Sequence, residues 1–172
     1  MAYVLEALVF PATMPWPQRL HRLRLVGLAG SPELVMLPLT SPAQEHMGRT
    51  PDDEPVLGFL ELVDPVRRFA AGLSIGGPVV YLHAEITGGT GTQGSVGWRG
   101  GQIDFGPMLT ANIAADLETD EYVLAEDVTQ GAINRALRHL GVRTAATALD
   151  EFDTVGLGLH RDTDEWISDR DR

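Results

Sequence analysis

The chain has 172 residues, of which 44% are hydrophobic and 22% charged, and its formal net charge is −11 at pH 7. This length and composition are typical of one globular domain, and we expect a single domain spanning residues 1–172. The absence of cysteine excludes disulfides, thiolate metal sites and cysteine nucleophiles, and the 13 basic residues are all arginine, which excludes the lysines of P-loops, kinases and Schiff bases.

The first predicted element is a strand over residues 3–10. It is apolar on both faces except at Glu6, which is typical of a strand near the middle of a sheet. The N-terminus lacks the basic residues of a signal peptide, and no apolar run approaches the roughly 20 residues that span a bilayer. We therefore expect a cytoplasmic protein with no membrane partner.

A hairpin and a helix are predicted on either side of a polar segment. Residues 25–29 and 34–39 are apolar and flank a Gly-Ser-Pro turn, which predicts paired strands. Residues 41–55 are polar and hold three of the eleven prolines, which favours a mobile loop. Asp64, as N-cap, and the proline after it begin a helix over about residues 65–75, where apolar residues recur at helical spacing.

The hydrophobic period changes to two over about residues 79–106. Three apolar runs alternate with polar residues and are separated by glycine pairs, which predicts a three-strand antiparallel meander. We expect the core side of this meander to carry Val96, Trp98, Ile103 and Phe105. A second main helix follows over about residues 129–140. The pattern predicts an α+β fold: an antiparallel sheet with two main helices.

The first turn of the meander contains a match to G-x-G-x-x-G. A dinucleotide site needs a helix after the glycines, and a kinase loop needs a lysine on the following strand. Here a glycine-rich segment with period two follows, and the chain has no lysine. We therefore expect this stretch to turn the chain, and we expect no nucleotide to bind between Gly88 and Gly94.

The less apolar face of the meander is the first candidate for a functional site. His83 and Glu85 lie two positions apart on one strand and share a face. We expect them to be joined there by Ser95, Arg99, Gln102 and Asp104. A histidine beside a carboxylate can act as an acid/base pair, and the same residues also suit a solvated face with cross-strand charge pairs. No third ligand follows from the spacing, so we assign no metal, no cofactor and no catalytic residue.

The second candidate is an acidic segment. From residue 116 onward the chain has 14 acidic residues against 6 arginines, and residues 116–127 contain no arginine. The acids that we expect to form a patch there are Asp116, Glu118, Asp120 and Glu121. Such a patch fits a basic protein surface and excludes nucleic acid as an expected partner; the same charge also suits solubility alone.

Three motifs carry a resemblance to other proteins: GGTGTQ at residues 88–93, INRALRHLGV at 133–142 and GLGLHRDTDEW at 156–166. Over roughly residues 60–166 the chain resembles a group of bacterial proteins with a G-G-x-G-x-Q hairpin, an I-x-x-A-L-R-x-L-G-V helix and a closing G-L-G-x-H-R-x-T-x-x-W segment. The group has no assigned activity, so the resemblance implies a shared fold and transfers no catalytic residue. From the residues themselves, we expect apolar side chains to dock the closing segment, with Asp162 or Thr163 capping a last helical turn.

Two functions remain open. The first is a non-enzymatic acidic interaction protein, of the immunity type, that binds a basic protein partner. The second is a small enzyme or ligand-binding module that uses the polar sheet face around His83 and Glu85. A pocket lined by His83, Glu85 and Arg99 would favour the second function, and a flat acidic face would favour the first.

Overall fold

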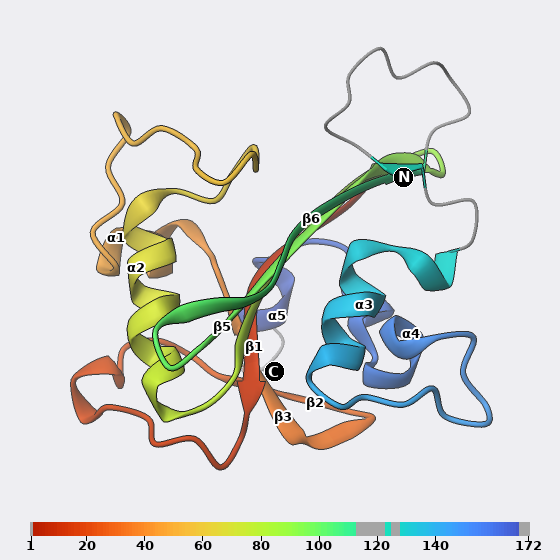
Figure 1. Cartoon of the computed structure of the whole chain (residues 1–172), viewed down its shortest axis with the longest axis horizontal. Helices are drawn as coiled ribbons and strands as arrows, with labels where there is room; N and C mark the ends of the chain where they lie inside the picture. Colours follow the sequence, from red (N-terminus) through yellow and green to blue (C-terminus); the bar gives the residue numbers. More distant parts are fainter. Residues whose placement is uncertain (1, 113–122, 125–127, 169–172) are drawn as a thin grey trace.

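The computed structural model describes residues 2–112, 123–124 and 128–168. Its centre is a seven-stranded sheet in the order β2-β3-β1-β4-β5-β6-β7, in which β7 runs parallel to β6 and the other neighbours are antiparallel (Figure 1). The strands are β1 (Ala2–Pro11), β2 (Val26–Leu28), β3 (Ser31–Pro38), β4 (Val79–Thr87), β5 (Thr90–Arg99), β6 (Gln102–Asn112) and β7 (Val123–Leu124). The α+β class, the central first strand, the N-terminal hairpin and the meander are confirmed.

Helices cover both faces of this sheet. Figure 1 shows the sheet nearly edge-on, with α2 on one side and α3 and α4 on the other. The helices are α1 (Ser41–His46), α2 (Asp64–Leu73), α3 (Ala132–His139), α4 (Glu151–Val155) and α5 (Glu165–Ser168), with 3-10 turns η1 (Gln18–Leu20), η2 (Ser74–Gly76), η3 (Val128–Gln130) and η4 (Leu157–Leu159). The two main helices predicted from the sequence are α2 and α3.

Two hydrophobic clusters pack against the two faces. Val80 and Leu82 of β4 belong to the cluster that includes α3, whereas Tyr81 between them belongs to the cluster that includes α2. Because both faces of the central strands are buried, these strands are apolar on both sides rather than alternating. This explains why a charged residue in such a strand is unusual.

The third strand of the meander differs from the prediction. Val96 and Trp98 are buried, as expected, but Ile103 is 43% exposed and Phe105 packs on the α3 side of the sheet. The pairing of β5 with β6 shifts register on either side of Gly97, which lies opposite Phe105. This irregularity at Gly97 breaks the simple alternation that placed all four residues on one side.

The segment predicted as a loop at residues 41–55 begins with α1. Thr40 caps this helix by accepting a hydrogen bond from the Ala43 backbone N–H at 3.4 Å, and Pro42 lies in its first turn. The next helix, α2, is preceded by Val63, so Asp64 is its first residue rather than its cap. The Asp64 side chain instead forms ion pairs within the helix.

The glycine motif forms the turn between β4 and β5. Gly88 and Gly89 have φ angles of 61° and 83°, and Thr87 pairs with Thr90 across them. Two successive residues with positive φ are typical of a two-residue type I′ hairpin turn, which favours glycine. A strand follows the turn, as predicted.

Candidate functional site

A single carboxyl group interrupts the apolar strand at the centre of the sheet. Glu6 of β1 is 8% exposed and lies opposite His83 of β4 in the strand pairing. The Tyr81 hydroxyl donates a hydrogen bond to Glu6 Oε1 at 3.0 Å, and the Gln44 side chain of α1 donates one to Oε2 at 2.8 Å. Both oxygens of this buried carboxyl therefore have a partner.

The amide of Gln44 is held in one orientation. Its Nε2 also donates to the Leu39 carbonyl at 2.8 Å, and its Oε1 accepts a hydrogen bond from Arg49. Arg49 in turn lies 3.6 Å from Glu61, measured between the nitrogen and oxygen of the ion pair. A reversed amide would face the Leu39 carbonyl with an oxygen and Arg49 with a second donor, so Gln44 can only donate to Glu6.

This arrangement determines where a proton on Glu6 can lie. The oxygen facing Gln44 has to remain an acceptor, so the proton of the neutral acid belongs on Oε1, beside Tyr81. A tyrosine hydroxyl can accept from the neutral acid or donate to the ionised one. Glu6 and Tyr81 can therefore keep their hydrogen bond in both protonation states.

The C-terminal segment docks on the free edge of β1. β3 pairs with β1 only beyond Glu6, so the N-terminal half of β1 needs other partners on that side. The Val4 N–H donates to the Arg161 carbonyl at 2.8 Å, and the Glu6 N–H donates to Thr163 Oγ1 at 2.9 Å. Thr163 is thus used by β1 rather than as a helix cap, while Asp162 accepts from the Asp164 N–H at 2.9 Å.

Together these elements border an open cavity of about 440 Å³, with Glu6 among the residues that line it. We refer to this cavity as the Glu6 cleft. Among the described residues that line it, Arg49 is the one basic side chain. The acidic side chains of the lining are Glu6, Glu45, Glu61, Asp162 and Asp164. The cleft therefore favours a ligand that is positively charged or donates hydrogen bonds.

Burial sets the protonation of the polar groups around the cleft. Loss of hydration raises the pKa of Glu6 to about 7, against the opposing effect of the hydrogen bonds from Tyr81 and Gln44. Burial lowers the pKa of His83, which favours a neutral imidazole, and raises the pKa of Tyr81 well above its usual value. A carboxyl that titrates near neutral pH can both release and accept a proton, as a general acid or base requires.

The residues predicted for a single polar face are divided between the two faces of the sheet. His83 pairs with Gly94 and Leu82 pairs with Ser95, so His83 and Ser95 point in opposite directions. His83 is buried on the Glu6 side, and Glu85, two residues further along β4, is exposed. The predicted grouping failed because alternation along one strand cannot show how the next strand is aligned with it.

Arg99 and Asp104 meet on the α3 side instead. Arg99 Nε lies 3.0 Å from Asp104 Oδ2, and His139 Nε2 lies 3.1 Å from the same oxygen. His139 also stacks on the ring of Phe105. These residues form a surface cluster remote from the Glu6 cleft. The predicted acidic patch of Asp116, Glu118, Asp120 and Glu121 lies outside the described residues.

One feature of the sequence points to the Glu6 cleft. Glu6 is the only polar residue in an otherwise apolar central strand, and an ionisable group at such a position has to be paired or neutral. Gln44 and Tyr81 carry no comparable signal, because a glutamine in a polar segment and a tyrosine in a strand are common. Their role depends on the packing of α1 against the sheet.

Comparison with known proteins finds no matching protein-family model, no matching curated protein and no matching solved structure. Within residues 2–112, 123–124 and 128–168, no three histidine, aspartate or glutamate side chains are grouped closely enough to hold a metal ion. In the same part of the chain no helix has the length and hydrophobicity needed to cross a membrane.

Proposed function

We propose that the protein is a ligand-binding module that takes a small amine into the Glu6 cleft. One observation carries this proposal: a carboxyl group that is 8% exposed lines a cavity of about 440 Å³ and has a pKa raised to about 7. A cavity of this volume lies within the range of roughly 300–1,000 Å³ that is common for small-molecule sites. Strongly perturbed pKa values in such cavities are frequent at functional sites.

The charges of the cleft support an amine rather than an anion. Of the described residues that line the cleft, five are acidic and one is an arginine, and this Arg49 is already engaged by Gln44 and Glu61. An ammonium group near Glu6 would favour the ionised carboxylate and so lower its pKa. Binding should therefore release a proton at pH values below 7, and its affinity should rise with pH toward 8.

Calorimetric titration with 1,4-diaminobutane tests this proposal. We expect binding to be tighter at pH 8 than at pH 6. We also expect a proton to be released at pH 6, which makes the binding enthalpy depend on the ionisation enthalpy of the buffer. Butyrate, an anion of similar length, should not bind. These titrations test both the preference of the cleft for a positively charged ligand and the release of a proton on binding.

Two glutamate variants assign the effect to Glu6. Glu6→Gln keeps the side-chain shape and should weaken amine binding at least about tenfold while abolishing proton release. Glu85→Gln removes the same charge from an exposed position of the neighbouring strand and should bind like the wild type. Equal loss in both variants, or binding without proton release, would contradict a site centred on Glu6.

The overall charge favours a second candidate function, recognition of a basic protein. The chain carries a net charge of −11, and the described acids at the rim of the Glu6 cleft include Asp162 and Asp164. Complementary charge of this kind mainly raises the rate of association. An interaction protein of the immunity type would use the acidic surface, whereas the amine site is centred on the buried carboxyl of Glu6.

A further inference from the structure

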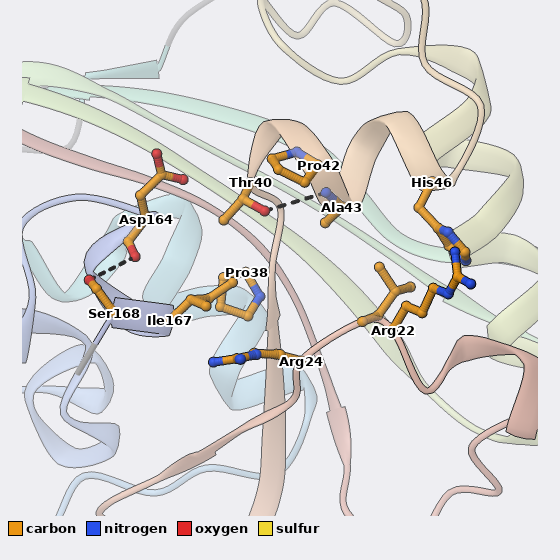
Figure 2. Close-up of a pocket in the computed structure, with 11 residues that line it drawn as sticks. Arg22, Arg24, Pro38, Thr40, Pro42, Ala43, His46, Asp164, Ile167 and Ser168 are labelled. Atoms are coloured by element: carbon orange, nitrogen blue, oxygen red, sulfur yellow. Dashed lines mark hydrogen bonds between the residues drawn. The ribbon is translucent and has the colours of Figure 1, made fainter. Parts of the chain in front are cut away.

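Figure 2 shows the residues that line a second cavity, of about 630 Å³. The two cavities share Thr40 and Asp164, but their other lining residues differ. The second cavity is formed by the segment before β2, by the end of β3 with α1, and by α5. We refer to it as the Arg22 cavity.

The floor of the Arg22 cavity is apolar. Leu23, Pro38 and Ala43 are buried there, and Ile167 of α5 is half-buried at its side. Beside this floor, Pro42 is exposed as well, and hydrocarbon that covers Pro42 and Ile167 gains free energy in proportion to the area removed from water. A wholly polar ligand would not gain this free energy.

The rim of the cavity is basic on one side. Arg22 and His46 are exposed and line the cavity on the side opposite Asp164 (Figure 2). Within the described part of the chain, neither Arg22 nor His46 forms an ion pair. Arg24 also lines the cavity. In a chain with a net charge of −11, Arg22 and His46 therefore form a local pair of basic groups that has no ion-pair partner among the described residues.

We propose that the Arg22 cavity binds a small amphiphilic anion, such as a medium-chain carboxylate. The hydrocarbon lies on Leu23, Pro38 and Ala43, and the carboxylate is held between Arg22 and His46. A guanidinium is suited to this contact because its planar donors match the two oxygens of a carboxylate. The site is separate from the amine site proposed above, since neither Arg22 nor His46 lines the Glu6 cleft.

Calorimetric titration with decanoate, below its micellar concentration, tests the proposal. We expect decanoate to bind in low salt and to bind more weakly as the salt concentration rises, because partly exposed charges are screened. Decyltrimethylammonium has the same chain with the opposite charge, and it should not bind the Glu6→Gln variant, in which the proposed amine site is disabled. Butyrate lacks most of the hydrocarbon, so no binding of butyrate should be detected at the concentrations at which decanoate binds.

Charge-neutral variants locate the site. Arg22→Gln with His46→Gln should weaken decanoate binding at least about tenfold, whereas Arg68→Gln, at an exposed arginine of α2, should leave it unchanged. Ile167→Glu adds a carboxylate beside the apolar floor and should also weaken binding. All four substitutions are at exposed or half-buried positions, so each of the three variants should fold, which circular dichroism checks.

The outcomes separate this inference from the proposed function. Glu6→Gln should bind decanoate like the wild type, and the Arg22→Gln, His46→Gln variant should bind 1,4-diaminobutane like the wild type. Binding of decanoate that persists in the double variant, or binding of decyltrimethylammonium to Glu6→Gln as tight as that of decanoate, would overturn the Arg22 cavity as an anion site. Binding to anionic vesicles without binding of free decanoate would overturn it in favour of a lipid surface.

Discussion

Burial of Glu6 should make the stability of the protein depend on pH. Folding raises the pKa of this carboxyl from 4.5 to about 7 because the charged form loses hydration. The folded state therefore holds the proton more tightly than the unfolded state. The resulting stabilisation is complete below pH 4.5 and is lost as the pH rises through 7, and a shift of this size corresponds to about 3 kcal/mol.

Glu6→Gln should remove this dependence. Its amide oxygen can accept from Gln44 and its amide nitrogen can donate to Tyr81, so the variant resembles the neutral acid. We expect Glu6→Gln to be more stable than the wild type at pH 8, by up to about 3 kcal/mol, and similar to it at pH 5. Urea unfolding at both pH values measures the difference.

His83 gives the stability of the fold a pH dependence of the opposite sign, so the wild type has to be compared with Glu6→Gln. Burial lowers its pKa, so the folded state loses stability when the pH falls below the ordinary value for histidine, 6.5. The difference between wild type and Glu6→Gln cancels this contribution. If the two proteins lost stability in parallel between pH 5 and pH 8, Glu6 would not be the group that titrates.

At the scale of elements, β5 allows a direct test of which face of the meander is core. Trp98 is 1% exposed and packs in the cluster that includes α2, while the next residue, Arg99, is 56% exposed at its side chain and pairs with Asp104. Trp98→Ala should lower the free energy of unfolding by about 3–5 kcal/mol. Arg99→Ala should lower it by at most about 1 kcal/mol, because exposed ion pairs contribute little. Similar losses in chemical unfolding would contradict the assigned faces.

The elements were predictable to the extent that their signals are local. Strand β1, the hairpin of β2 and β3, and helices α2 and α3 follow from hydrophobic period and turn residues that lie within each element. Helix α1 was missed because its two turns are short and polar. Its stability depends on the Thr40 cap and on Gln44 contacting Glu6, and a contact across 38 positions of the chain leaves no pattern within the segment.

At the scale of the whole molecule, the candidate site could not be predicted because its parts are far apart in the sequence. The site combines Glu6 of β1 with Gln44 of α1, Tyr81 of β4 and Thr163 of the C-terminal segment. These residues meet only when α1 and the C-terminal segment pack against the same stretch of β1. The sequence placed His83 in a candidate site, and the structure places it opposite Glu6. Its expected neighbours Arg99 and Asp104 lie on the other face, because the sequence could not show the strand register.

The last prediction concerns the charge of the whole chain. A net charge of −11 exceeds the magnitude of roughly 2–8 that keeps a small domain soluble, so we expect the acidic segment at residues 116–127 to bind a basic protein. The tagged protein should capture such a partner from an extract of its native host at low salt and release it at high salt, since the screening length falls from about 10 Å at 0.1 M to about 3 Å at 1 M.

Neutralising Asp116, Glu118, Asp120 and Glu121 together should abolish this capture. The matched control is a variant with the same change in net charge at four exposed acids elsewhere, Glu33, Asp52, Glu54 and Glu85, and it should capture the partner like the wild type. Equal loss in both variants would mean that net charge, and not this segment, attracts the partner. Capture unchanged by the first variant would mean that the segment is a solvated surface, because a specific contact made by four charges cannot survive their removal.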